Sequence, residues 1–278
     1  VSAGRKQLIA ISHICIIITL CFTFIQRPKI TPMQIGLLII GDELLSGRRQ
    51  DKHLSHCIET LAQRDLRIDW VRMARDDAAL LQDEFRRIRD SGDLCFSFGG
   101  IGATPDDITR QCVAAAWEVD LYRHPDAVRE IEAQFGDAAY PQRIRMGELP
   151  QGSTIIPNPV NRVPGFSMDH LHCLPGFPEM AWPMLEWVLD THYRDLASNR
   201  EIEYALVLDD AHESELIELM ESLLAKHTAI KIFSLPRFLD NDRRRLELGV
   251  KGESHAARLA YEELKQALAG RSYTYTEQ

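Results

Sequence analysis

The chain has 278 residues, a formal net charge of −9, 45% hydrophobic residues and 26% charged residues. This length suffices for one large domain and a small one, and the ordinary globular composition requires neither disulfides nor a structural metal. The negative net charge argues against a general nucleic-acid-binding surface, so we expect no nucleic acid as a partner.

The cysteines indicate a reducing compartment. None forms a C-x-x-C pair, and none has zinc-finger spacing to a histidine. Most lie in apolar runs, where cysteine packs as a small hydrophobic residue, so we expect reduced thiols. The six are Cys15, Cys21, Cys57, Cys95, Cys112 and Cys173.

Residues 1–32 differ from the rest of the chain. Residues 8–25 carry no formal charge, and as a helix they would reach about 27 Å, just short of a hydrocarbon core of ~30 Å. The flanking charges are balanced and no A-x-A-like cleavage site follows, so neither an orientation nor a secretory signal is indicated. We expect a cytoplasmic protein that starts functionally at Met33 and has no membrane partner. A membrane anchor, or another role for this stretch, is the alternative.

From residue 34 onward, short strands alternate with helices. We predict strands at 34–40, 67–73 and 93–98, where apolar or alternating runs end at glycine or polar residues. This alternation implies βαβ units and a parallel sheet. The intervening helices are predicted from apolar stripes at Leu54, Ile58 and Leu61, at Leu81, Phe85 and Ile88, and at Ile108, Cys112 and Ala115.

The region 121–189 is less regular. It predicts a helix at 128–135, strands at 154–156 and 170–174, and a helix at 178–189 with Met184, Leu185 and Val188 facing inward. Taken with the preceding βαβ units, this predicts a three-layer α/β/α domain over 33–195 with a mostly parallel sheet.

A polar stretch at 195–201 separates a second unit. Its pattern is strand 204–208, helix 213–224, strand 230–235, strand 244–250 and helix 256–268. Apolar residues alternate with polar ones in the third of these strands, so one face of the sheet is solvated. We therefore expect a small α+β domain over 202–270 with its helices on one face.

Three turns follow predicted strands, and ligands bind parallel sheets at the carboxyl ends of their strands. The turns are G-D-E-L-L-S-G at 41–47, R-D-D at 75–77 and G-G-I-G-A-T-P-D-D at 99–107. In the third turn, Gly99, Gly100 and Gly102 permit positive φ and close backbone approach. Such a turn, together with the N-terminus of the next helix, forms an anion site.

The polar residues of the third turn extend this interpretation. We expect Thr104 to cap the following helix, with Pro105 at its first position and Asp106 and Asp107 in its first turn. These carboxylates could hold Mg²⁺ against a bound phosphate. A Gly-rich strand-to-helix turn with acidic capping residues is the plainer alternative. The turn matches neither the P-loop nor G-x-G-x-x-G.

Other candidate residues have plainer explanations. His170 and His172 share one strand face beside Asp169, but the sequence positions no third metal ligand, so a hydrogen-bonded or solvent-facing pair is favoured over a metal site. The arginines at 243–245 could meet a phosphate or an acidic partner, although charge at the solvated edge of a strand is the commoner arrangement. Trp182 and Trp187 are predicted to pack between helix and sheet.

Five ordered segments resemble the molybdopterin-binding domain, and most closely the N-terminal part of the competence/damage-inducible protein A (CinA) family. They lie between about Met33 and Leu189: the G-D-E-L-L-S-G turn, Asp76, G-G-I-G-A-T-P-D-D-I-T, I-P-N-P-V-N-R-V-P-G-F at 156–166 and L-P-G-F-P-E-M at 174–180. The later βαββα unit resembles the small domain that follows in CinA proteins, and we expect this protein to lack the deamidase domain that many full-length members carry.

The resemblance implies a molybdopterin, pterin-phosphate or adenine-dinucleotide ligand. It implies that Asp76 and Asp107 serve metal-assisted chemistry on a phosphate or adenylate. Asp107 and Asp76 are the first candidates for Mg²⁺ ligands, and Asp42 and Glu43 are the second. Independently, two carboxylates at adjacent strand ends could share one Mg²⁺ that neutralises phosphoryl charge. The implied ligand-binding residues are Gly41, Asp42, Glu43, Ser46, Gly47, Gly99, Gly100, Gly102, Thr104, Asp106, Pro175 and Gly176.

Two departures from the family pattern affect the expected ligand pocket. Asn161-Arg162-Val163 stands where the family usually has G-T-A, which changes the shape of the pocket and adds a positive charge. The P-G-F-P-E-M loop is also one residue shorter than usual.

Our leading hypothesis is a protein that binds molybdopterin or a related phosphorylated pterin or nucleotide. The first alternative is an enzyme, either a Mg²⁺-dependent pyrophosphatase acting on ADP-ribose or a similar dinucleotide, or an adenylate-handling enzyme of molybdenum cofactor biosynthesis. The second is a non-catalytic regulator that keeps only the fold. In each case we expect a homo-oligomer with a small phosphorylated ligand.

Overall fold

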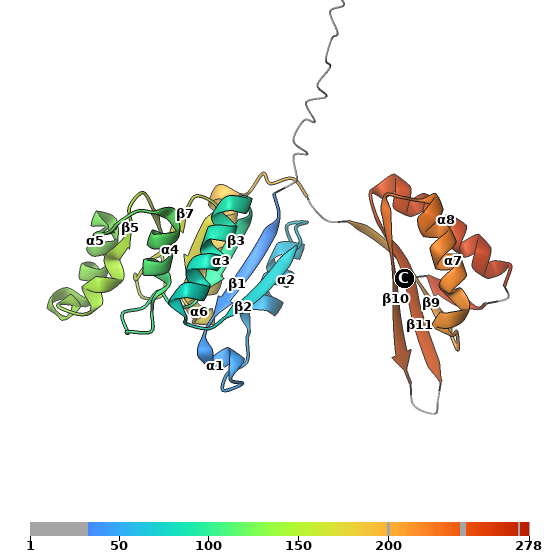
Figure 1. Cartoon of the computed structure of the whole chain (residues 1–278), viewed down its shortest axis with the longest axis horizontal. Helices are drawn as coiled ribbons and strands as arrows, with labels where there is room; N and C mark the ends of the chain where they lie inside the picture. The colour runs from blue at the N-terminus through green and yellow to red at the C-terminus, as the bar shows by residue number, and fades with distance from the viewer. Residues whose placement is uncertain (1–32, 199–200, 240–242, 272, 278) are drawn as a thin grey trace, which may run out of the picture. The chain divides into compact units, whose positions relative to one another are not determined.

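A computed structural model describes residues 33–198, 201–239, 243–271 and 273–277 (Figure 1). The predicted apolar segment at 8–25, with Cys15 and Cys21, lies outside the described residues. The four described cysteines, Cys57, Cys95, Cys112 and Cys173, are buried and form no disulfide bond. Over these ranges, no helix combines the length and apolar character needed to cross a membrane.

A six-stranded sheet organises the first part of the chain. Its strand order is β2-β1-β3-β8-β7-β6. Pairings β2–β1, β1–β3 and β3–β8 are parallel, whereas β8–β7 and β7–β6 are antiparallel. The predicted mostly parallel sheet is therefore confirmed. The bounds are β1 Ile35–Ile40, β2 Trp70–Ala74, β3 Leu94–Phe98, β6 Thr154–Ile156, β7 Gly165–Met168 and β8 Leu171–Leu174.

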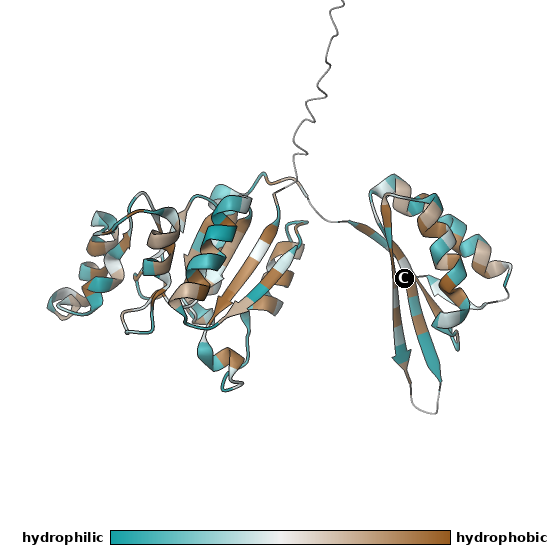
Figure 2. Ribbon diagram, viewed as in Figure 1, coloured by the Kyte–Doolittle hydropathy of each residue, from teal (hydrophilic) through white to brown (hydrophobic). Residues whose placement is uncertain are grey.

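Helices cover both faces of this sheet, because every residue of β1 is buried and alternate residues enter different cores. Leu38 and Ile40 belong to a core with α3 (Ala78–Ser91) and α4 (Thr109–Trp117). Leu37 and Ile39 belong to a core with α2 (His53–Ala62) and α6 (Pro178–His192). Figure 2 shows that the central strands of the sheet consist mostly of hydrophobic residues. This arrangement is the predicted three-layer α/β/α fold.

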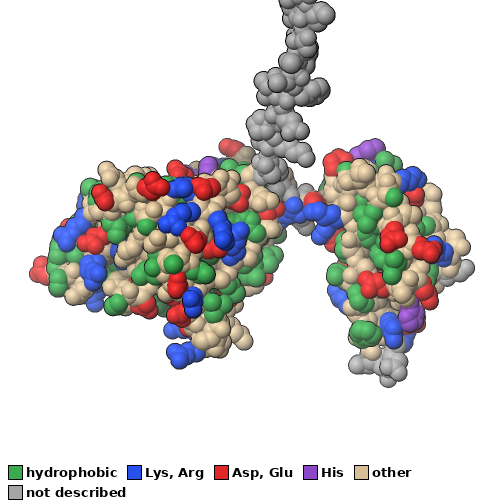
Figure 3. Space-filling model, in the orientation of Figure 1, with side chains coloured by type: hydrophobic (Ala, Val, Ile, Leu, Met, Phe, Trp, Pro, Cys, Tyr) green, Lys and Arg blue, Asp and Glu red, His purple; other side chains and the backbone are tan. Residues whose placement is uncertain are grey.

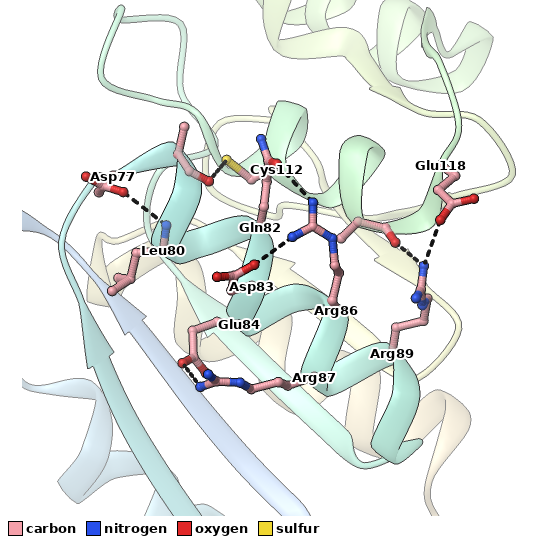
Figure 4. Close-up of polar contacts among 12 residues, drawn as sticks. Asp77, Leu80, Gln82, Asp83, Glu84, Arg86, Arg87, Arg89, Cys112 and Glu118 are labelled. Atoms are coloured by element: carbon pink, nitrogen blue, oxygen red, sulfur yellow. Dashed lines mark hydrogen bonds and ion pairs between the residues drawn. The ribbon is translucent and has the colours of Figure 1, made fainter.

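Helix α3 follows its sequence pattern closely. The Asp77 carboxylate accepts a hydrogen bond from the Leu80 amide at 3.0 Å at the start of the helix, and Gly92 ends it with a φ of 70°. Its predicted stripe of Leu81, Phe85 and Ile88 is fully buried. On its outer face, Arg86 and Arg87 form ion pairs with Asp83 and Glu84 (Figure 4). Figure 3 shows acidic and basic side chains interspersed there.

Two other predicted stripes were partly wrong. In α2, Ile58 is 52% exposed, and Cys57 is buried beside Leu61 instead. The buried face therefore runs through His53, Cys57 and Thr60. It is rotated by one residue relative to the predicted stripe. In α4, Ala115 is exposed while Val113 is buried, because α4 packs against α3 on one side and β5 (Glu148–Pro150) on another.

The irregular region forms an insertion with a small core of its own. Ile131, Ala139 and Ile144 make up the buried part of this core. Its elements are β4 (Leu121–Arg123), α5 (Pro125–Phe135), the 3₁₀ helices η1 (Gly136–Ala139) and η2 (Arg143–Gly147), and β5, which pairs antiparallel with β4.

A four-stranded antiparallel sheet organises the last part of the chain, with strand order β10-β11-β9-β12. Both of its helices pack on one face, over a core that includes Leu246, Leu248 and Val250. The predicted order of elements is confirmed, with β12 in addition. The bounds are β9 Ile202–Asp209, α7 Glu213–Lys226, β10 Ile230–Phe238, β11 Arg244–Gly252, α8 Ser254–Ala269 and β12 Tyr275–Glu277.

The explanation of arginines 243–245 as the edge of a strand was wrong. Strand β11 lies inside the sheet, between β10 and β9. Arg243 instead pairs with Asp210 at 3.6 Å, and Arg245 pairs with Asp209 at 2.9 Å. The Arg245–Asp209 pair joins β11 to β9, and both ion pairs balance positive charge locally.

Candidate functional site

The predicted turns meet at one edge of the six-stranded sheet. Strands β2, β1, β3 and β8 are neighbours and parallel, so their carboxyl ends lie side by side. The Gly41 amide donates to the Ala74 carbonyl at 3.0 Å. The Asp42 amide donates to the Asp76 carboxylate at 3.2 Å. These contacts hold the first two turns together at the strand ends.

A cavity of about 430 Å³ opens at this edge. Asp42, Ser46 and Gly47 are not among its lining residues. The Ser46 hydroxyl lies 3.3 Å from the Glu43 carbonyl, to which it donates. The predicted ligand and catalytic residues that do line the cavity are Gly41, Glu43, Asp76, Gly99, Gly100, Gly102, Thr104, Asp106, Asp107, Pro175 and Gly176.

The third turn is packed so closely that it requires glycine. At Gly99, where φ is 105°, a Cβ atom would lie 2.4 Å from the Ile40 carbonyl oxygen. At Gly100, where φ is 69°, a Cβ atom would lie 2.3 Å from the Thr109 hydroxyl. That buried hydroxyl donates to the Gly99 carbonyl at 3.0 Å. Both positions combine positive φ with close backbone approach, as the sequence predicted.

The predicted start of the next helix was wrong. Helix α4 begins at Thr109, so Thr104 is not its cap, and Asp106 and Asp107 do not lie in its first turn. The reason is a separate turn that precedes the helix. The Asp107 carboxylate accepts from the Thr104 amide at 2.9 Å and from its hydroxyl at 2.5 Å. The Thr109 amide donates back to the Gly100 carbonyl at 3.0 Å.

The backbone amides of the third turn are available for a ligand. Gly100, Ile101 and Gly102 line the cavity. Their amides donate to no acceptor within the described part of the chain. Buried or half-buried amides without acceptors are rare in folded proteins. Three consecutive residues of the cavity lining therefore have amides without an acceptor in the described part of the chain.

Acidic side chains dominate the electrostatics of the cavity. Burial raises the pKa of Asp76, and the nearby charges of Asp42, Glu43 and Asp106 raise it further, while the hydrogen bond from the Asp42 amide lowers it. Arg49 is the one lysine or arginine among the described residues that line the cavity. No motif or periodic pattern in the sequence indicates this residue.

The fit to a metal ion is partial. In the described ranges, no group of three or more His, Cys, Asp or Glu side chains could hold a metal ion. Asp42 reaches Asp76 through its amide, and its side chain does not line the cavity. Asp76 and Asp107 both line it and carry the oxygen ligands that Mg²⁺ prefers. The Mg²⁺ site stays a prediction.

Arg110 connects the third turn to the insertion. Its side chain is only 4% exposed, and its guanidinium donates to the carbonyls of Gly102, Arg145 and Glu148. Burial lowers the pKa of Arg110. Through this link the insertion contributes Phe135 and Met146 to the cavity wall. The sequence predicts the helix that carries Phe135 but gives no sign that this helix meets the third turn, so it did not indicate this contribution.

The segment at 156–166 shapes another wall of the cavity. The Asn158 side chain donates to the Asn161 side chain at 2.8 Å and to the Val163 carbonyl at 2.9 Å. Asn158, Asn161 and Val163 line the cavity, but Arg162 does not; it pairs with Glu130 at 2.9 Å. Asn161 and Val163 of the departing segment therefore line the pocket, whereas the expected positive charge in the pocket was wrong, because Arg162 lies outside the lining.

The histidine pair is satisfied by hydrogen bonds. His170 and His172 lie 3.2 and 2.9 Å from the Tyr193 hydroxyl, and His172 also lies 2.8 Å from the Ser167 hydroxyl. Burial lowers the pKa of His172 to about 3. This arrangement is the one the sequence favoured over a metal site. Trp182 and Trp187 pack against the core, as predicted.

Comparison with known proteins identifies the family. Residues 36–194 match the model of the probable molybdopterin binding domain, and the chain belongs to this family. A CinA-like protein from Anaeromyxobacter sp. (strain K) is 34% identical over 165 residues, which cover 56% of this chain and 40% of the relative. A CinA-like protein from Citrifermentans bemidjiense is 28% identical over 216 residues, covering 74% of this chain and 51% of the relative.

A solved structure agrees with this assignment. The protein CinA from Thermoplasma acidophilum, described as of unknown function, superposes with a TM-score of 0.52 at 27% identity, over 56% of this chain and 97% of its own. The predicted resemblance to the CinA family is thus confirmed. The chain spans about two fifths of the length of the first CinA-like relative and about half of the second.

Proposed function

We propose that this chain binds a phosphorylated pterin or nucleotide in the cavity at the strand edge. The observation that carries the proposal is the row of free amides at Gly100, Ile101 and Gly102. Phosphate oxygens supply the acceptors that these donors lack, as in other glycine-rich anion sites.

The family and the size of the cavity both favour a pterin ligand. The family model is named for molybdopterin binding and covers every turn that lines the cavity. A volume of about 430 Å³ falls in the range of small-molecule sites, roughly 300–1,000 Å³. We therefore take molybdopterin, or a related phosphorylated pterin, as the leading ligand and an adenine nucleotide as the next.

The charge of the cavity implies that a cation enters with the ligand. Glu43, Asp76, Asp106 and Asp107 line the cavity with a single arginine. A phosphate would be repelled by this excess of carboxylates unless a cation compensates them. We propose that Asp76 and Asp107 bind Mg²⁺ and that binding of phosphate depends on it.

The same carboxylates favour a second candidate function. The like charges around Asp76 are the arrangement that a divalent cation relieves. A Mg²⁺ ion there, beside a bound pyrophosphate, would stabilise charge that develops on the phosphoryl group. Mg²⁺-dependent hydrolysis of ADP-ribose or a similar dinucleotide is therefore the alternative.

One experiment separates these functions. The chain from Met33 is titrated with a phosphorylated pterin and with ADP-ribose by calorimetry, with and without Mg²⁺, and AMP is measured by chromatography. Pterin binding without turnover supports the leading proposal. AMP release that is lost in Asp107→Asn but kept in the control Asp137→Asn, which lies outside the cavity lining, supports the hydrolase. If the chain neither binds the pterin nor releases AMP, the remaining explanation is a regulator that keeps only the fold.

A further inference from the structure

A second cavity, of about 420 Å³, adjoins the one described above. The two share five lining residues: Ile40, Glu43, Arg49, Gly176 and Phe177. We propose that they form one site with two chambers. The phosphate of a ligand lies in the first chamber, and the flat nitrogen-containing ring of the same ligand lies in the second. This inference rests on the proposed function.

The wall of the second chamber is held in place by contacts within the protein. His53 is buried and stacks on Phe98, with ring centroids 4.3 Å apart. Its Nε2 lies 3.2 Å from the Gly176 carbonyl, which can only accept, so Nε2–H donates. This bond fixes the start of α2 against the loop that lines the first chamber. Such a preorganised wall suits a rigid, flat ligand group.

The chemistry of the second chamber favours a neutral ring over a second anion. The first amides of α2 are already occupied, because the Asp51 carboxylate accepts from His53 N at 3.0 Å and from Leu54 N at 2.9 Å. Asp51 and Glu179 line this chamber, and together with Glu43 they outnumber Arg49 and Lys52 by one charge, so the lining disfavours a second phosphate. Their carboxylates instead accept hydrogen bonds from ring amino groups, which pterin and adenine both carry. Leu44 and Pro178 add apolar surface to a wall that also includes Ile39, Gln50 and Lys52.

Two residues on the shared wall match the two parts of such a ligand. Arg49 makes no side-chain hydrogen bond or ion pair with the other described residues, and it lines both cavities. Its guanidinium is suited to a phosphate at the junction. Phe177 also lines both cavities and is 55% exposed, so its ring is free to stack on the ring of a ligand.

The test compares probes with and without a ring. AMP and neopterin monophosphate each carry one flat aromatic ring system and one phosphate, and inorganic phosphate carries no ring. Their Kd values are measured with the chain from Met33 in Mg²⁺. Leu44 lines only the second chamber, whereas the neighbouring Leu45 lines neither and is 55% exposed. We expect Leu44→Trp to fill part of the second chamber and so to weaken binding of the tighter ring probe about tenfold or more. Binding of inorganic phosphate should be unchanged. Leu45→Trp is the matched control.

A second pair of variants does not depend on filling the chamber. Phe177→Ala removes an exposed ring and should weaken ring probes about tenfold without affecting inorganic phosphate. Arg49→Gln should weaken all three probes, whereas Arg48→Gln, at an exposed neighbour that lines neither cavity, should not. The preference between AMP and neopterin monophosphate identifies the ring.

The outcomes separate this inference from the proposed function. If the unmodified chain binds none of the three probes, the proposed function fails and the two-chamber site fails with it. If it binds them, but Leu44→Trp and Phe177→Ala affect ring probes no more than inorganic phosphate, the two-chamber site is overturned while the phosphate site stands.

Discussion

Burial and three neighbouring carboxylates raise the pKa of Asp76 above its ordinary value of 3.8. For an acid this direction means that the folded state holds the proton more tightly than the unfolded state, so wild-type stability falls as pH rises from 3.8 through the folded pKa. We predict that Asp76→Asn raises the melting temperature at pH 7, where the wild-type carboxylate is charged. The side-chain amide oxygen introduced by this substitution would still accept from the Asp42 backbone.

Thermal unfolding of both proteins at pH 7 and below pH 3.8 checks this prediction. The difference should disappear at the lower pH, where the carboxyl group is protonated in both states. The same substitution should weaken any Mg²⁺-dependent binding, as expected of a site that gives up stability for function. A melting temperature below that of the wild type at pH 7 would contradict the electrostatic account.

His172 has the opposite dependence on pH. Its pKa is about 3 in the folded protein and about 6.5 in the unfolded chain. Between these values the unfolded state binds the additional proton, so the stability that neutral His172 contributes is complete above 6.5 and is lost as pH falls toward 3. A single such group changes the free energy of unfolding by about 1.4 kcal/mol per pH unit.

Urea unfolding at pH 7, 6 and 5 measures this effect. His172→Gln should reduce the loss of stability between pH 6 and 5 by about 1 kcal/mol relative to wild type. Equal slopes for the wild type and the His172 variant would show that this histidine does not titrate as proposed.

At the scale of elements, the turn after β3 depends on space as well as on backbone conformation. Gly100 and Gly47 have nearly the same φ, 69° and 74°, but a Cβ atom at Gly100 would lie 2.3 Å from the Thr109 hydroxyl, while at Gly47 nothing lies within 4 Å. We predict that Gly47→Ala destabilises by about 1 kcal/mol, from positive φ alone. Gly100→Ala should destabilise by about 3 kcal/mol, because the clash adds to that effect.

Denaturant unfolding compares the two alanine variants directly. Gly100→Ala should also weaken phosphate binding, because it shifts the turn that carries the free amides, whereas Gly47→Ala should not. Similar destabilisation by both substitutions would mean that the turn accommodates the extra Cβ atom at no cost in free energy of unfolding. The close packing at Gly100 would then contribute nothing to stability.

Some of these elements could be predicted from the sequence and others could not. The stripe of α3 was predictable because it follows the helical period, and the buried strands β1 and β3 were predictable because they are short apolar runs that end at glycine. The glycines of the third turn were predictable because few other residues fit such a turn. The start of α4 was not, since the Asp107 carboxylate closes a local turn with Thr104 instead of joining the helix. Strand β7 lies among prolines and glycines, which obscure alternation.

The missed site residues lack a local signal for a different reason. Arg110 acts through carbonyls as far away as residue 148, and Phe135 reaches the cavity from the irregular insertion. Arg49 belongs to no periodic pattern. Contacts of this kind arise from the packing of elements distant in sequence, so they appear only in the folded structure.

At the scale of the molecule, each of the two larger sheets has its own buried core. We therefore propose domains at 33–195 and from 202 onward, with the second extended past residue 270 to include β12. A fragment of residues 33–198 should fold alone and keep the ligand affinity of the longer chain within about twofold, because every residue lining both cavities lies within it. Cooperative unfolding and calorimetry of the fragment measure this, and a fragment that fails to fold would contradict the domain proposal.

The most direct test of the phosphate site is a crystal structure of the chain with Mg²⁺ and the tightest phosphorylated ligand. The account predicts phosphate oxygens within hydrogen-bonding distance, about 2.7–3.2 Å, of the amide nitrogens of Gly100, Ile101 and Gly102. It also predicts the metal on Asp76 and Asp107. A phosphate bound elsewhere, with these amides facing only solvent, would contradict the account.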